Sequence, residues 1–253
     1  MSKTVTLIYG LLCYAIFLGV FVYAIGFIGG FATPTMLDGP PHGSAAVALT
    51  VDLVLLGIFA VQHSVMARPA FKRWWTRIVP EAAERSTYVL ASSLLLVGFF
   101  VWWRPIGGVV WQAPDGGPRI ALIALYLFGW ALLLYATFLI DHFDLFGLRQ
   151  VWRRRAEQPY QAPQFYTPSL YRLVRHPIYV GWLVIFWAAP MMTVAHLVFA
   201  VMTTAYILIG IHLEERDLVD TFGETYVNYR RKTPMLIPRL WKAREADRQA
   251  KRV

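Results

Sequence analysis

The sequence predicts an all-α fold, a polytopic bundle of membrane helices with about six hydrophobic helical segments. Of the 253 residues, 57% are hydrophobic and only 15% are charged, whereas about a quarter of the residues in a soluble domain are charged. The stretches 5–28, 87–103 and 120–140 contain no charged side chain. Apolar runs of about 18 residues or more can span a bilayer, and a soluble amphipathic helix would interrupt them with regularly spaced polar residues.

The chain is expected to form a single membrane domain over residues 1–253. We expect its helices at 5–28, 45–65, 87–103, 120–140, 178–192 and 196–213. The first is too long for the core of a secretory signal, so we expect it to be retained. The last two are short, and Pro190 lies just before the residues that separate them. Because a proline near a helix end resists continuation, we expect a tight helical hairpin there, followed by a charged tail, helical or frayed, beyond Pro238.

The distribution of positive charge assigns the loops to sides of the membrane. Stretch 67–86 carries five Lys and Arg residues, 142–176 carries six, and the chain after 213 carries ten, whereas 29–44 carries none. Basic loops lie on the cytoplasmic side. We therefore expect an integral protein of a bacterial inner (plasma) membrane with both termini in the cytoplasm. This arrangement requires 178–213 to cross twice, because a single crossing would leave the ten-charge tail outside.

Several other classes of protein fit the composition poorly. The net charge of +9 is explained by basic loops that contact membrane lipid, so no nucleic-acid partner is expected. Cys13 is the one cysteine, which excludes an internal disulfide and a cysteine metal cluster. The six histidines are scattered, which argues against a di-iron oxidase, and no metal is expected. A small transporter stays open as an alternative, although the short segments show no inverted repeat. The oligomeric state also stays open.

The first chemical motif is Arg175-His176-Pro177-Ile178-Tyr179-Val180-Gly181-Trp182. A proline suits the first turn of a helix, where its missing N–H costs nothing. The free N–H groups that follow it, together with the helix dipole, would attract a carboxylate. A basic start of a membrane helix with interfacial aromatic residues would show the same pattern.

The second motif is Glu214-Glu215, followed by Leu218, Phe222-Gly223, Tyr226, Tyr229 and Arg230. Two adjacent carboxylates directly after an apolar helix are costly beside a membrane and need a reason. One can accept hydrogen bonds from a ligand ammonium or ribose while the other anchors the helix end. The alternative is an amphipathic interfacial helix with its acids and bases on the wet face.

Taken in this order across an apolar hairpin, the two motifs resemble the isoprenylcysteine carboxyl methyltransferase and phospholipid methyltransferase superfamily of membrane enzymes. The resemblance implies a site for S-adenosylmethionine at the cytoplasmic face, within 142–253, with substrate-side helices in 1–141. The cofactor-binding residues that it implies are Arg175, His176, Tyr179, Gly181, Glu214, Glu215, Tyr226, Tyr229 and Arg230. It leaves open a lipid substrate, either a prenylated cysteine or a phospholipid amine.

A third block narrows the resemblance. The run 141–152 and the stretch 61–72 resemble the methanethiol S-methyltransferase branch of that superfamily. This implies methyl transfer from S-adenosylmethionine to methanethiol, a small volatile thiol, with dimethyl sulfide as the product.

Methyl transfer to a thiol requires the thiolate, which is the reactive form. A positioned base can remove the proton, or a nearby cation can favour the anion. The catalytic candidates are His142 with Asp144 or Asp141, His63, and Arg149 or Arg175 as the cation. Asp52 is expected to be structural, and no role is expected for His42 or His196.

Overall fold

A computed structural model describes residues 1–161 and 164–239. The charged tail, which we expected to be helical or frayed, lies outside the described residues from 240 onward. The long helices are α1 (Lys3–Gly29), α2 (Ala45–Ala67), α4 (Glu81–Trp102), α5 (Gly117–Leu139) and α10 (Val194–Phe222). The other elements are α3 (Pro69–Trp75), β1 (Val109–Gln112), α6 (His142–Leu145), α7 (Leu148–Arg155), α8 (Leu170–Leu173), α9 (Pro177–Trp187), β2 (Met191–Thr193) and α11 (Glu224–Lys232).

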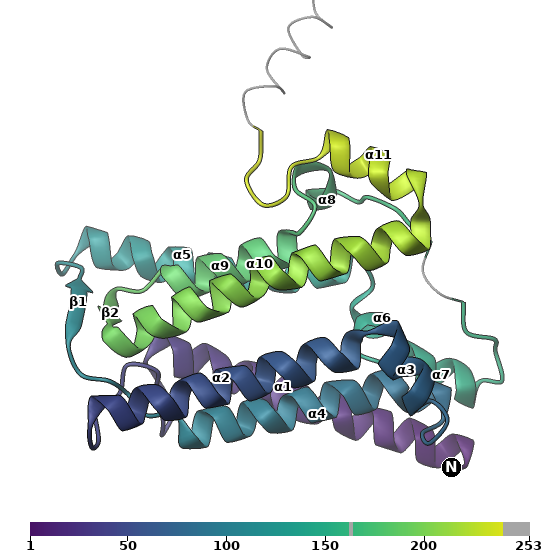
Figure 1. Ribbon diagram of the computed structural model, residues 1–253, viewed down its shortest axis with the longest axis horizontal. Helices are drawn as coiled ribbons and strands as arrows, with labels where there is room; N and C mark the ends of the chain where they lie inside the picture. Colours follow the sequence, from purple (N-terminus) through teal and green to yellow (C-terminus); the bar gives the residue numbers. More distant parts are fainter. Residues whose placement is uncertain (162–163, 240–253) are drawn as a thin grey trace, which may run out of the picture.

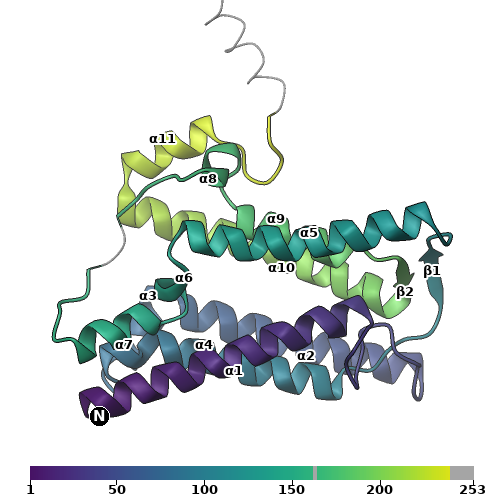
Figure 2. The same ribbon diagram turned by 180° about the vertical axis from the view of Figure 1, so that it is seen from behind.

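The helices form two layers (Figure 1). In one layer α4 packs against both α1 and α2, and in the other α9 packs against both α5 and α10. Figure 2 shows the same two layers from behind. The N-terminus, α3, α6 and α7 lie at one end of the long axis, and β1 and β2 lie at the other (Figures 1 and 2). This separation agrees with the alternation of basic and uncharged loops in the sequence.

Apolar side chains face outward along the long helices. Leu12 of α1, Val61 of α2 and Ile209 of α10, for example, are each about 60% exposed, although none of them lies at a helix end. Exposed apolar surface of this extent marks a contact with another apolar medium. Within the described residues, five helices (α1, α2, α4, α5 and α10) are long and apolar enough to cross a membrane. The expected all-α polytopic membrane bundle is therefore confirmed.

The expected hairpin 178–213 has different boundaries in the structure. The helix α9 ends at Trp187, because 188–190 leads into β2, which pairs antiparallel with β1. The helix α10 is not short: it runs for 29 residues to Phe222. No glycine or proline interrupts it after residue 210, and Gly223, with φ 54°, ends it. Glu214 and Glu215 therefore lie inside α10 and not beyond its end.

Glycines bring α5 and α9 close together. A side chain at Gly129 would lie 2.9 Å from Ile185, and one at Gly181 would lie 2.9 Å from the backbone nitrogen of Leu133. Aromatic contacts then fill the middle of the bundle, among them the pair Trp130–Trp182 and the pair Phe186–Phe199. This packing fixes the direction of α9 and so the position of its first turn.

Candidate active site

The site is built around the first turn of α9. Pro177 occupies the first helical position, as the motif predicts, and His176 precedes it. The backbone N–H of Arg175 donates to the Pro234 carbonyl at 2.9 Å, and the N–H of His176 donates to the Met235 carbonyl at 3.3 Å. The chain that follows α11 is thereby tied to the start of α9.

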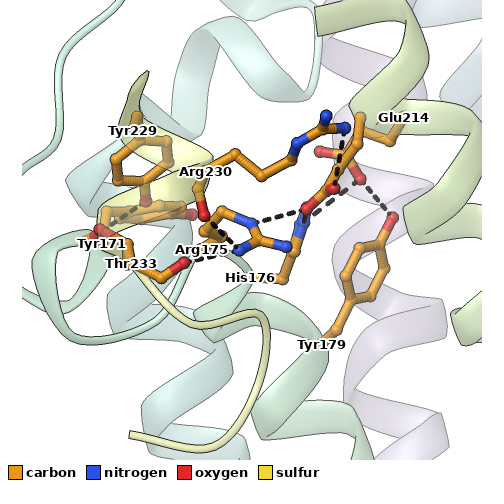
Figure 3. A network of polar contacts seen from close by, with 9 residues as sticks. Tyr171, Arg175, His176, Tyr179, Glu214, Tyr229, Arg230 and Thr233 are labelled. Atoms are coloured by element: carbon orange, nitrogen blue, oxygen red, sulfur yellow. Dashed lines mark hydrogen bonds and ion pairs between the residues drawn. The ribbon is translucent and has the colours of Figure 1, made fainter. Parts of the chain in front are cut away.

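Glu215 of α10 lies at the centre of a network of polar contacts. Figure 3 shows this network, with its partners Arg175 and His176 labelled. Arg175 donates from Nε to Glu215 Oε1 at 2.7 Å, and His176 Nε2 lies 3.0 Å from the same oxygen. The side chains of Arg175 and Glu215 are each only 11% exposed, and a guanidinium nitrogen of Arg230 lies 3.9 Å from Oε2. Several charged donors can hold a carboxylate in its ionised form despite burial. Glu215 therefore joins α9 to α10.

Glu214 lies beside this network with more freedom. The Tyr179 hydroxyl donates to Glu214 Oε2 at 2.8 Å, and the Glu214 side chain is 42% exposed (Figure 3). Its Oε1 makes no hydrogen bond within residues 1–161 and 164–239. Of the two adjacent carboxylates, Glu214 is thus the one with an oxygen available to a ligand.

Three backbone carbonyls complete the network. Arg175 donates from its terminal nitrogen to the Thr233 carbonyl at 2.6 Å and to the Arg230 carbonyl at 3.1 Å. The Tyr229 hydroxyl donates to the carbonyl of Tyr171, in α8 (Figure 3). Sequence reasoning missed Thr233 and Tyr171, because a carbonyl acceptor is present at every residue and gives no sequence signal.

Aromatic rings cover one side of the network. Phe165 packs against Tyr226 and Tyr229, with ring centroids 5.8 and 5.4 Å apart. Tyr226 is 2% exposed, and its hydroxyl has no hydrogen-bond partner in the part of the chain that the structure describes. Burial raises the pKa of Tyr226, and it raises that of Tyr229 to about 12. Both hydroxyls therefore keep their protons, and an unpaired buried donor is costly unless a ligand satisfies it.

Gly181 was predicted beside the cofactor, and the structure shows it in a helix contact. The position faces Leu133 of α5, whose backbone would collide with any side chain there. The glycine is therefore required for the close approach of α5 and α9.

The candidate His63 lies in a second polar cluster, on α2 and α4. The Tyr88 hydroxyl lies 2.8 Å from His63 Nε2, and the Ser92 hydroxyl lies 3.2 Å from Nδ1. The neighbouring Ser64 contacts the Tyr206 hydroxyl of α10 at 3.2 Å. This contact joins the two layers two turns before Glu214.

The end of α2 is also bonded to α10. Arg68 forms an ion pair with Asp217 at 2.9 Å and donates to the Leu213 carbonyl at 3.3 Å. The structure therefore brings the His63 cluster and the Glu214 region to the same end of the bundle.

His142 begins α6 and is buried in a third cluster. The Tyr14 hydroxyl lies 2.8 Å from His142 Nε2, and the Thr137 hydroxyl lies 2.8 Å from Nδ1. The ring of Phe138 stacks on the imidazole with centroids 4.4 Å apart. Burial lowers the pKa of His142, so the neutral form is favoured. Both ring nitrogens of His142 are thus hydrogen-bonded, and its surroundings are mostly apolar.

The other candidates in 141–152, Asp144, Asp141 and Arg149, have polar contacts of their own. Tyr160 donates to Asp144 Oδ2 at 3.1 Å, and burial raises the pKa of this carboxyl. Arg149 pairs with Asp141 at 2.6 Å. Within the described residues no hydrogen bond joins Asp144 to His142. His142 was predicted to act with Asp144 or Asp141, and no hydrogen bond from its ring to Asp141 is seen in the described residues either.

Two buried ionisable groups have structural contacts. Asp52 accepts a hydrogen bond from the backbone N–H of Arg104 at 2.9 Å, which fits the structural role that we expected. His196, for which we expected no role in an outer turn, is buried in the first turn of α10. Its ring nitrogens lie 2.7 Å from Asp38 and 3.0 Å from the Phe186 carbonyl. The sequence alone could not show that the distant Asp38 would reach it.

Comparison with known proteins adds independent information. The chain is 54% identical over 238 residues to methanethiol S-methyltransferase of Crocosphaera subtropica, a match that covers 94% of this chain and 93% of the relative. It is 50% identical over 238 residues to methanethiol S-methyltransferase of Mycobacterium tuberculosis, covering 94% of this chain and 98% of that protein. Nurim of Rattus norvegicus is 30% identical over 184 residues, 69% of this chain and 70% of the relative. No family model and no solved structure matches the chain.

Proposed function

The chain belongs to the methanethiol S-methyltransferase family, and we propose that S-adenosylmethionine is its methyl donor, bound around the first turn of α9. The reaction is the S-methylation of methanethiol, the activity for which the relatives are named. When bound, the donor supplies a methyl group that is already activated on a sulfonium. The protein must then align the thiol sulfur with that methyl group, exclude water and accept the thiol proton.

The observation that carries this proposal is the incomplete bonding of Glu214 and Tyr226. Glu214 has a half-exposed carboxylate with one oxygen free of hydrogen bonds in the described chain, which suits the ammonium of the methionyl group. The Tyr226 hydroxyl is buried without a partner, and the nearby Phe165 and Tyr229 rings offer apolar surface to an adenine. The residues present therefore fit the charge and the polarity of the donor.

The network of Arg175, His176 and Glu215 has a different task in this proposal. Its groups already bond to one another at 2.7–3.0 Å. It holds α9, α10 and α11 in the arrangement that presents Glu214 and Tyr226. Arg230 is 46% exposed at its side chain, and its guanidinium can reach the donor carboxylate.

We place this site at the cytoplasmic face, with both termini in the cytoplasm. The end of the bundle that holds α3, α6 and α7 (Figure 1) carries the basic stretches 67–86 and 142–176. Positive residues near membrane helices favour the cytoplasmic side. Bacterial relatives are consistent with an inner-membrane location.

Titration with S-adenosylhomocysteine tests the donor site. Purified protein in detergent should bind this compound, and Glu214→Gln should weaken the affinity about tenfold to a hundredfold, as expected when a charged hydrogen bond is lost. Glu224→Gln is the matched control, because Glu224 is exposed at the start of α11. Absence of binding to the unsubstituted protein, or equal affinity for both variants, would contradict the proposed site.

A further inference from the structure

The surroundings of His63 determine which of its ring nitrogens carries the proton. Ser92 donates its one hydroxyl hydrogen to the Gln62 side-chain oxygen at 3.3 Å. The Ser92 oxygen can therefore only accept from His63 Nδ1, 3.2 Å away. This leaves Nε2 with a free lone pair. The Tyr88 hydroxyl lies 2.8 Å from Nε2 and 3.0 Å from Nδ1, and of these two nitrogens only Nε2 can then accept its hydrogen. Tyr88, His63, Ser92 and Gln62 thus form a directed chain of hydrogen bonds.

The part of α2 that carries His63 lies beside α10, the helix that carries Glu214. Arg68, at the end of α2, pairs with Asp217 at 2.9 Å and donates to the Leu213 carbonyl at 3.3 Å. Tyr206 contacts Ser64, the residue next to His63, at 3.2 Å. The end of α2 next to His63 is therefore bonded to α10 on both sides of Glu214.

A cation lies one turn before Tyr88. The side chain of Arg85 has a buried Nε with no hydrogen-bond partner, and the residue has no ion pair in the ranges that the structure describes. A cationic side chain in a membrane helix is costly when one of its buried nitrogens has no partner, and this cost calls for a functional reason. Because Arg85 and Tyr88 are three residues apart, they share one face of α4.

From these contacts we propose that Tyr88 and His63 form the relay that deprotonates methanethiol. The S–H bond breaks as its proton passes to the Tyr88 oxygen, while the Tyr88 hydroxyl proton passes to His63 Nε2. The electron pair of the S–H bond stays on sulfur as the thiolate, which Arg85 stabilises, and then forms the bond to the donated methyl group. The imidazolium loses its proton to solvent when the product leaves. This assignment rests on the proposed function.

The His142 cluster has a similar pattern but no such position. Thr137 donates to the Leu134 carbonyl at 2.7 Å, so His142 Nε2 is also the accepting nitrogen, and Tyr14 lies beside it. Among the described residues, however, no hydrogen bond joins Tyr14, His142 or Thr137 to α9 or α10. By contrast, Ser64, which follows His63 in α2, contacts the Tyr206 hydroxyl of α10.

The test compares Tyr88→Phe with Tyr135→Phe in the full-length protein. Tyr135 is a matched control, because it is 51% exposed on α5 and outside the site. At neutral pH, Tyr88→Phe should lower kcat/KM for methanethiol about 10²–10⁴-fold, the usual contribution of a general base. Its affinity for S-adenosylhomocysteine should stay within twofold. The deficit should shrink about tenfold per pH unit as solvent ionises the thiol, since thiolate is the reactive form.

Normal kcat/KM in Tyr88→Phe, or a loss that does not change with pH, would overturn the relay. If Tyr88→Phe does not bind S-adenosylhomocysteine, that variant is misfolded. His63→Gln then tests the relay through the same dependence of kcat/KM on pH. Glutamine can still bond to Tyr88 and Ser92 but accepts no proton. Failure of the proposed function looks different, because the unsubstituted protein would then form no dimethyl sulfide from S-adenosylmethionine.

Discussion

The Arg175 guanidinium and the Glu215 carboxylate meet at 2.7 Å, which ties the residue two before α9 to the inner face of α10. His176 shares the same oxygen, so one carboxylate orders both residues that precede Pro177. The position of the whole donor site depends on this contact, because the chain after α11 is bonded to the backbone of Arg175 and His176.

Replacement of Glu215 should therefore damage folding as well as binding. Glu215→Ala leaves Arg175 buried without its partner, and removing one member of a buried pair costs about 3–5 kcal/mol. We expect a lower thermal unfolding temperature in detergent together with a large loss of S-adenosylhomocysteine affinity. An unchanged unfolding temperature would show that the pair does not hold the helices together.

Gly181 should respond to substitution through packing. Gly181→Ala places a methyl group 2.9 Å from the Leu133 backbone, and overpacking of this kind costs about 1–3 kcal/mol. Gly210→Ala is the control, since nothing lies within 4 Å of a side chain there. Thermal unfolding of both variants should show a loss for Gly181→Ala alone. Equal unfolding temperatures, with weaker donor binding only in Gly181→Ala, would instead indicate a direct contact with the donor.

Substitution of His142 tests whether its cluster with Tyr14 and Thr137 is structural or catalytic. His142→Ala removes the partner of both Tyr14 and Thr137, and unsatisfied buried groups cost about 1–3 kcal/mol each. We expect reduced stability, with near-normal turnover per folded molecule. The measurement is dimethyl sulfide formation normalised to the amount of protein that binds S-adenosylhomocysteine. If His142→Ala had normal stability but had lost turnover, His142 would have a catalytic role.

The orientation in the membrane can be tested by cysteine labelling. Asp115→Cys lies between β1 and α5, and Gln158→Cys follows α7 at the opposite end of the bundle; both positions are exposed. The native Cys13 is buried and gives little background. In intact cells an impermeant maleimide should label Asp115→Cys and not Gln158→Cys. The reverse pattern would contradict the cytoplasmic placement of the donor site.

Most of the fold could be predicted from local sequence. The uncharged runs set the spanning helices, and the placement of Arg and Lys set the alternation of loops. The boundaries of α9 and α10 could not be predicted in this way. The helix α10 continues through Glu214 and Glu215 because both are good helix formers and bond to other elements, whereas an apolar run ends at the first charge. The pairing of β1 with β2 joins strands about 80 residues apart, which no local pattern encodes.

Most residues of the site could be predicted from the sequence, but which of them contact one another could not. The motifs named Arg175, His176, Glu214 and Glu215 as one group, and the structure brings all of them together. Which carboxylate is engaged depends on the helical positions of the two: Glu215 faces Arg175, and Glu214 faces Tyr179. Tyr88 belongs to none of the motifs. Its proposed role rests on a contact with His63, 25 residues earlier in the chain, which the local sequence does not reveal.

Methyl transfer from S-adenosylmethionine to methanethiol can be tested by following the methyl group itself. Purified protein in detergent would be incubated with methanethiol and S-adenosylmethionine that carries a deuterated methyl group, and the headspace analysed by mass spectrometry. We predict dimethyl sulfide with one deuterated methyl group, at a rate lowered by Glu214→Gln. If the dimethyl sulfide were unlabelled, the methyl group would not come from S-adenosylmethionine. If no dimethyl sulfide formed while added prenylcysteine or phospholipid became labelled, methanethiol would not be the acceptor.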